Sequence, residues 1–257
     1  MGSQDLLTQT QMLERRVPQV MPRAIAILPA YNEEEAITTT IADLRAHAPE
    51  LDVLVVNDGS KDGTSAAARA AGAIVLDLPC NLGIGGAVQT GFKYAQRAGY
   101  AIALQFDGDG QHLASEIPKL LAPLLCDEAD VALGSRFLGE GGFRSTALRR
   151  AGIYLFYRVN SWLTGQAITD NTSGFRAYSR ETIAFLAENS PTDYPEPEAV
   201  VLLARNGFRL KEVAVEMRVR QGGRSSITAL WSVYYMIKVV LAVLLAGARA
   251  PIVRRRA

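Results

Sequence analysis

Short apolar runs alternate with longer amphipathic stretches along the first half of the chain. The apolar runs at 25–28, 52–56, 73–77, 101–106 and 131–133 predict β-strands, and the stretches at 33–47, 64–71, 85–97 and 115–125 predict helices between them. Strands that alternate with helices indicate an α/β fold with a mainly parallel sheet and helices on both faces. After Ser135 this alternation gives way to longer polar loops.

Polar clusters follow three of these predicted strands. Residues 29–33 follow the first, residues 57–64 follow the second, and Asp107 and Asp109 directly follow the run at 101–106. The carboxyl ends of parallel strands share one edge of a sheet, and open α/β sheets bind ligands there. We therefore expect the three clusters to meet at a single binding edge.

Asp107 and Asp109 are the strongest candidates for chemistry. In an extended segment two carboxylates at this spacing can point the same way, and Gly108 between them lets a ligand approach the backbone. Such oxygen ligands suit Mg²⁺ or Mn²⁺, an ion that keeps several waters and is usually completed by substrate phosphates. This favours a nucleotide diphosphate ligand. A solvated turn is the alternative, since Asp and Gly are common turn residues.

Composition narrows the class of protein. A chain of 257 residues with 49% hydrophobic content can bury the core of one large α/β domain or of two small ones. The formal net charge of +1 provides no overall basic field of the kind that binds nucleic acid. Cys80 and Cys126 are too few for a disulfide scaffold or a zinc cluster, so a reducing cytoplasm is the expected compartment. Residues 1–22 show no secretory signal, and we interpret them as an N-terminal extension.

A series of ordered motifs resembles family-2 glycosyltransferases with the GT-A fold, a Rossmann-like α/β architecture. The motifs lie at 29–33, 57–64, 81–86, 107–112, 135–137, 170–176, 196–198 and 220–225. Within the family, the chain looks most similar to the polyprenyl-phosphate (dolichyl-phosphate-like) sugar transferases. The resemblance covers about residues 23–226, which we take as the GT-A domain.

The resemblance implies an inverting, metal-dependent enzyme that moves a sugar from a UDP- or GDP-sugar to a polyprenyl phosphate. We place acceptor recognition in the polar loops after Ser135. Two alternatives stay open. One is a GT-A transferase with a soluble or saccharide hydroxyl acceptor, and the other is a non-catalytic sugar-nucleotide-binding or scaffold protein. The intact Asp107 and Asp109 disfavour the second.

The resemblance also assigns a donor site. Its base and ribose pocket falls on Pro29, Tyr31, Glu33 and Asp58. Tyr31 offers a stacking face, and Asp58 or Glu33 can accept hydrogen bonds from the base or the ribose. A tight turn is the alternative for Asp58.

Phosphate contacts are expected from a glycine loop and from arginines. The loop at 81–86, with Asn81 and Gly85, resembles a phosphate-binding loop that opens a helix, although many relatives carry Lys or Arg where Ile84 stands. The missing charge is expected from guanidinium forks in the motifs that match the family, with surface salt bridges as the alternative. These arginines are Arg136, Arg176 and Arg220.

The metal site implied by the motif consists of Asp107, Asp109 and Gln111, with Asp107 also near the nucleotide sugar. We interpret the neighbouring His112 as ordinary polarity at a helix start, because a lone histidine is no nitrogen site for a hard metal.

Asp170 and Glu198, with Glu196 beside it, are candidate catalytic acids from family motifs. A turn cap for Asp170 and a helix start for Glu196 and Glu198 are the alternatives. A lipid phosphate, with a second pKa of about 6, is already an oxyanion at neutral pH and needs no general base. These acids therefore do not decide the acceptor.

The C-terminal segment 227–257 predicts an apolar helix followed by basic residues. Lys238 interrupts the apolar stretch, Trp231 and Tyr234 lie near its start, and Arg254 and Arg255 follow it. A helix in the interface on the cytoplasmic face of a membrane fits better than a spanning one, since a central Lys costs about 2.5–3.5 kcal/mol. A helix docked on the domain, a homo-oligomer contact and a small membrane-protein partner are the alternatives.

Overall fold

The computed structural model describes residues 21–108, 110–138, 161, 165–166, 168–191 and 194–218, together with residues 238, 241, 245, 247 and 252. The predicted extension at 1–22 and the C-terminal helix at 227–257 therefore lie almost wholly outside the described residues. Among the helices that are described, none has both the length and the apolar character needed to cross a membrane.

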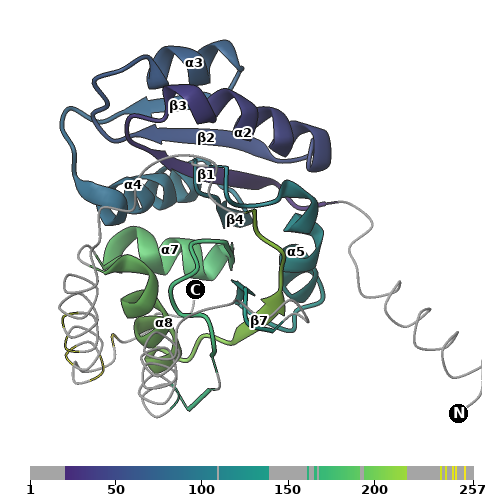
Figure 1. Ribbon diagram of the computed structural model, residues 1–257. Helices are drawn as coiled ribbons and strands as arrows, with labels where there is room; N and C mark the ends of the chain where they lie inside the picture. The colour runs from purple at the N-terminus through teal and green to yellow at the C-terminus, as the bar shows by residue number, and fades with distance from the viewer. Residues whose placement is uncertain are drawn as a thin grey trace, which may run out of the picture.

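A mixed sheet forms the centre of the described structure (Figure 1). Its strands are β1 (Ala24–Ala30), β2 (Asp52–Asn57), β3 (Ile74–Asp77), β4 (Ile102–Gln105), β5 (Val131–Ser135), β6 (Arg176–Ser179) and β7 (Leu210–Ala214). Their order is β3-β2-β1-β4-β6-β5-β7, and every pairing is parallel except those of β6, which runs antiparallel to both β4 and β5.

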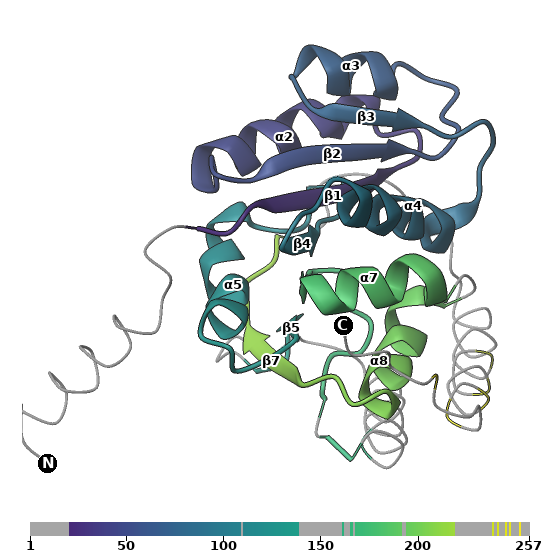
Figure 2. The same ribbon diagram turned by 180° about the vertical axis from the view of Figure 1, so that it is seen from behind.

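Helices cover both faces of this sheet, as predicted. They are α2 (Glu34–His47), α3 (Thr64–Ala70), α4 (Gly83–Arg97), α5 (Ile117–Leu125), α7 (Arg180–Asn189) and α8 (Pro195–Arg205), with a short 3₁₀ turn, Ala114–Glu116, before α5. Alternate residues of β1 serve two cores: Leu28 packs with α2, α3 and α5, whereas Ile27 packs with α4, α7 and α8. The two views show α2 and α4 on opposite faces (Figures 1 and 2).

The predicted strands and helices of the first half are all present, with small shifts at their ends. The second half holds more regular structure than the polar loops that the sequence predicts. Its strand β7 is a half-exposed edge strand without an apolar run, and β6 has only four residues. Helix α7 did carry a start signal, because the Ser179 side chain accepts a hydrogen bond from Thr182 N.

The register brings the strand ends together at one edge. Ala30 pairs with Asn57, Asn57 pairs with Asp77, and Ile27 pairs with Gln105. Because β6 is antiparallel, the segment that precedes Arg176 reaches this same edge. The predicted binding edge is therefore present, and it is extended by residues 168–175.

Candidate active site

The loops after β1 and β2 are joined by hydrogen bonds. Asn32 N donates to Ser60 Oγ at 2.9 Å, Lys61 N donates to Asn32 Oδ1 at 2.9 Å, and Glu33 N donates to Thr64 Oγ1 at 2.9 Å. These contacts bring the predicted nucleoside residues of the two loops to one place. Tyr31 is 45% exposed, so its side chain is accessible to a ligand.

Asp58 connects this cluster to the glycine loop. Its buried carboxylate accepts a hydrogen bond from Leu82 N at 2.7 Å. Gly59, with φ +69°, allows the close approach, because a Cβ there would lie 2.8 Å from Asn81 N. Asn81 Oδ1 in turn accepts from Gly83 N, the first residue of α4. Asp58 thus supports the loop that contains Asn81 and Gly85.

Asp107 lies just beyond β4, enclosed by neighbouring backbone. A Cβ at Gly174 would lie 2.9 Å from Asp107 Oδ1, so the loop before β6 passes directly over the carboxylate. From the other side, Thr40 Oγ1 on α2 donates to Gly108 O at 3.3 Å. Pro29 also borders this loop, since a Cβ at Gly108 would lie 3.3 Å from its carbonyl oxygen.

His112 belongs to this cluster, although the sequence interpretation gave it no role there. Asp107 N donates to His112 Nδ1 at 3.1 Å, and His112 Nε2 lies 3.4 Å from Asp107 Oδ2. The ring is stacked on Phe175, with centroids 4.7 Å apart, and meets Phe106 edge-on. The contact between Asp107 and His112 could not be predicted from the sequence, because the two residues are five positions apart across a turn.

The segment after β7 pairs with the Asp107 loop. Arg218 N donates to Gln111 O at 2.8 Å, and Met217 forms an antiparallel bridge with His112. Gln111 is therefore fixed through its backbone. Of the other predicted residues, Asp109 and Arg220 lie outside the described residues.

The described donor set fits a hard divalent ion. Asp107 carries carboxylate oxygens on a side chain that is 31% exposed, and Gln111 carries an amide oxygen. Within the described residues, no group of three or more His, Cys, Asp or Glu is arranged to hold a metal alone.

Arg136, directly after β5, forms a bidentate pair with Asp170. The Arg136 Nε and Nη2 atoms donate to Asp170 Oδ2 and Oδ1 at 2.7 and 2.8 Å, and the Asp170 side chain is 0% exposed. Burial alone would raise the pKa of Asp170, but the hydrogen bonds and charge of Arg136 outweigh it and lower that pKa below its ordinary value. Hydrogen bonds to Asp170 likewise raise the pKa of Arg136. A carboxylate held in this way is a weak base.

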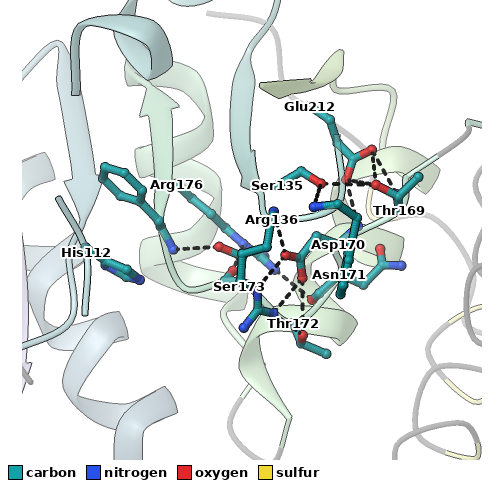
Figure 3. A network of polar contacts seen from close by, with 12 residues as sticks. His112, Ser135, Arg136, Thr169, Asp170, Asn171, Thr172, Ser173, Arg176 and Glu212 are labelled. Atoms are coloured by element: carbon teal, nitrogen blue, oxygen red, sulfur yellow. Dashed lines mark hydrogen bonds and ion pairs between the residues drawn. The ribbon is translucent and has the colours of Figure 1, made fainter. Parts of the chain in front are cut away.

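Glu212 on β7 supports the same loop, and sequence reasoning missed it. Its carboxylate accepts from Thr169 N at 2.8 Å and from Asp170 N at 2.7 Å. Thr169 Oγ1 lies 3.1 Å from Ser135 Oγ at the end of β5. Figure 3 shows Glu212, Asp170 and Arg136 in one continuous network. The half-exposed strand β7 gave no sign that Glu212 points toward the site loop.

Arg176 is 1% exposed, and its guanidinium binds backbone carbonyls. Its Nε, Nη1 and Nη2 atoms donate to Ser173 O, Glu196 O and Asn171 O at 2.7, 2.8 and 2.9 Å. Arg176 therefore holds the loop before β6 to the start of α8, as Figure 3 shows for its loop contacts. A phosphate contact would require this buried side chain to give up those bonds.

Glu196 and Glu198 lie in the first turn of α8, as the helix-start alternative predicts. Glu198 Oε1 accepts from Tyr194 N at 3.0 Å and so caps the helix. Burial raises the pKa of Glu196; the charge of Arg176 opposes this rise and that of Asp107 adds to it. The Asp107 charge therefore acts on the Glu196 carboxyl.

Comparisons with known proteins identify the family of the chain. A family model described as glycosyl transferase family 2 matches residues 25–185. The chain is 31% identical over 218 residues to a polyprenol monophosphomannose synthase of Mycolicibacterium smegmatis, covering 80% of this chain and 81% of that protein. It is 33% identical to an undecaprenyl-phosphate mannosyltransferase of Micrococcus luteus, covering 80% and 88%.

A solved structure shares the fold. Glucosyl-3-phosphoglycerate synthase of Mycobacterium tuberculosis, in complex with Mn²⁺, uridine diphosphate and phosphoglyceric acid, matches with a TM-score of 0.66 and 21% identity, covering 94% of this chain and 83% of that one. The mostly parallel sheet of the described residues is thus that of a GT-A glycosyltransferase. The family match and the curated relatives together show that the chain is a glycosyltransferase and belongs to glycosyl transferase family 2.

Proposed function

We propose that this enzyme transfers a hexose, with inversion, from a nucleotide diphosphate sugar to a polyprenyl phosphate in a metal-dependent reaction. The observation that carries the proposal is the strand register, which places the ends of β1, β2 and β4 at one edge. The nucleoside cluster and Asp107 therefore face the same ligand space. The acceptor class follows relatives that are named for transfer to polyprenyl phosphates.

The donor binds across the first half of the sheet. The exposed Tyr31 offers its ring to the base, and the loop held by Asp58 presents the amino end of α4 to the diphosphate. The positive end of the helix dipole favours an anion, which compensates in part for the apolar Ile84.

Asp107, with Asp109 and Gln111 as the sequence motif predicts, would hold the Mg²⁺ or Mn²⁺ ion. When bound, such an ion neutralises the charge that develops on the departing diphosphate. Asp107 receives its orientation from the protein, through the amide contact with His112 and the close passage of Gly174.

The contacts of the candidate acids favour a phosphate acceptor. Asp170 is paired with Arg136 and has a lowered pKa, and Glu198 caps α8. Neither is arranged as a general base, and an acceptor phosphate needs none because it is already an oxyanion at neutral pH. A hydroxyl acceptor is the second candidate, because burial and the charge of Asp107 raise the pKa of Glu196, which is the direction of shift found in general bases.

The test is a transfer assay with Mn²⁺ or Mg²⁺, a panel of UDP- and GDP-sugars, and short-chain polyprenyl phosphate or phosphoglycerate as acceptor. We expect a metal-dependent, lipid-linked product, and a loss of about 100-fold in Asp107→Asn, since a metal supplies several kcal/mol of charge stabilisation. Asp127→Asn, at a side chain that is 90% exposed, is the matched control. Turnover of phosphoglycerate alone, or of neither acceptor, would reject the lipid assignment.

We place the enzyme at the cytoplasmic face of a membrane, held there by the predicted helix at 227–257. Replacing Arg254, Arg255 and Arg256 together by Gln should weaken cosedimentation with anionic vesicles, by about 1 kcal/mol for each charge. Unchanged binding would favour a docked helix or an oligomer contact.

A further inference from the structure

His112 contacts Asp107 at two points. Its Nδ1 accepts a hydrogen bond from the Asp107 backbone N–H at 3.1 Å, and its Nε2 lies 3.4 Å from the Asp107 carboxylate. One ring thus contacts both the main chain and the side chain of the same acidic residue. These two contacts are more than the sequence interpretation of His112 as ordinary polarity at a helix start predicts.

The ring cannot easily adopt another orientation. His112 is 3% exposed, stacked on Phe175 with an interplanar angle of 18°, and set edge-on against Phe106 at 5.2 Å. The bridge between His112 and Met217 fixes its backbone from the opposite direction. Figure 3 shows His112 beside the loop that leads into Arg176. The imidazole is therefore a rigid support.

The contacts also select one tautomer. A nitrogen that accepts an amide N–H carries no proton, so the neutral ring carries its proton on Nε2, the atom that faces the carboxylate. Asp107 Oδ2 lies 3.4 Å from this nitrogen, close enough for electrostatic attraction. On the other side of the carboxylate, Gly174 passes so close that a Cβ would lie 2.9 Å from Oδ1. The imidazole and the loop thus border the carboxylate, whose side chain is 31% exposed.

We propose that His112 is a positioning residue, whose two nitrogens set the orientation in which the Asp107 carboxylate receives the divalent ion. The inference rests on the proposed function, because it concerns the same metal site. Hydrogen-bond partners behind a metal ligand typically contribute about 10- to 100-fold to metal affinity or activity. His112 supplies that support without being a ligand itself.

Three substitutions separate the ring from its nitrogens. His112→Phe keeps the flat ring and its stacking but loses both polar contacts. In His112→Gln the amide nitrogen takes the place of Nε2, whereas in His112→Asn the amide oxygen takes the place of Nδ1. If His112 has only a structural role, both Mn²⁺ affinity and stability should be highest in His112→Phe, the variant that keeps an aromatic ring.

The readouts are Mn²⁺ affinity in the presence of UDP, followed by electron paramagnetic resonance of the free ion, and urea unfolding of the metal-free protein. We expect His112→Phe, which loses both contacts, to bind Mn²⁺ about 10- to 100-fold more weakly, and His112→Asn and His112→Gln, which keep one contact each, to lie between it and the parent protein. Stability should follow the opposite order, with His112→Phe the most stable of the three. Metal affinity that follows the ring instead would overturn the proposal.

A second measurement uses no metal. Nitrogen NMR of the imidazole in the metal-free protein should report a proton on Nε2 and none on Nδ1, and a proton on Nδ1 would overturn the proposal. Asp107→Asn distinguishes a failure of the proposed metal site from a failure of the role proposed for His112. If it leaves Mn²⁺ affinity unchanged, the proposed metal site is wrong; if it weakens Mn²⁺ binding while His112→Phe does not, only the role of His112 is wrong.

Discussion

The two halves of the sheet hold their site residues by different means. In the first half, from β1 to β4, polar side chains follow the ends of parallel strands and are tied by contacts to backbone amides, such as Asp58 to Leu82 N. In the second half, the loop before β6 is held by an ion pair whose carboxylate is buried and by Glu212 on β7, 42 residues away in the sequence. The loops of the first half therefore depend on local backbone geometry, whereas the loop before β6 depends on paired charges, each of which needs its partner.

Removing one charge of the Arg136–Asp170 pair should give the largest effect. Asp170→Asn leaves the Arg136 guanidinium without its compensating charge; because this side chain is 29% exposed and water can reach it, we expect a cost of about 3 kcal/mol, the lower end of the range for buried pairs. The free energy of unfolding, measured in urea, should fall by that amount with little change in m. Asp127→Asn, in the exposed pair with Arg209, is the control and should change it little. Equal losses in both variants would contradict the comparison.

Acid should weaken the second half through the same residue. The folded-state pKa of Asp170 is lowered, so the unfolded state binds more protons at acid pH and stability rises with pH. The contribution of Asp170 is complete above its unfolded pKa of about 3.9 and is lost as pH falls through the lower folded value. The difference in unfolding free energy between the parent protein and Asp170→Asn should therefore shrink below about pH 4. If the difference in unfolding free energy between the two proteins grows in acid, the pKa of Asp170 is raised by folding and not lowered.

A glycine substitution tests the backbone geometry of the first half. In Gly59→Ala the new Cβ lies 2.8 Å from Asn81 N at a φ of +69°, so we expect a loss of about 1–3 kcal/mol and weaker UDP binding. Gly99→Ala also has positive φ, but nothing lies within 4 Å of its Cβ. Gly99→Ala should lose only the stability that alanine costs at a positive φ, and its UDP affinity should not change. Loss of UDP binding in both variants would mean that general destabilisation is the cause.

A hydroxyl behind the Asp107 loop should have the smallest effect. Thr40 Oγ1 donates to Ala36 O at 3.0 Å and to Gly108 O at 3.3 Å, whereas Thr39 Oγ1 reaches only Ala36 O among these carbonyls. Thr40→Val should cost about 1 kcal/mol and slightly weaken Mn²⁺ binding, because one shared hydrogen bond is lost. Thr39→Val should leave Mn²⁺ affinity unchanged. Equal Mn²⁺ affinities in the two variants would mean that the contact to Gly108 does not support the loop.

The difference between the halves also explains what could be predicted. Strand ends at 29–33, 57–64 and Asp107 were predicted to meet because they follow apolar runs, and local periodicity specifies such elements. Glu212 was missed because it lies on a half-exposed strand and acts on residues far away in sequence. No local pattern encodes such a pair.

Individual residue roles were harder to predict than their location. Arg176 was expected at a phosphate because its guanidinium suits one, but the fold buries it against backbone carbonyls that only the folded loop brings together. His112, in contrast, was given no role, yet it contacts Asp107 across a turn and stacks on Phe175 from another loop. The motif indicated where chemistry occurs, and tertiary contacts decided which atoms face it.

The antiparallel strand β6 has a consequence for how the chain is made. Strand β4 pairs with β6, and the segment after β7 reaches back to the start of α5, where Glu216 N donates to Glu116 Oε2 across 100 residues. During synthesis β1 to β4 emerge first, so one side of β4 stays an open edge until residues 176–179 have left the ribosome. Such long-range closure is slow, and an unpaired edge is prone to association. The Asp107 loop is therefore completed late, when the segment around Met217 joins a sheet that is already mostly formed.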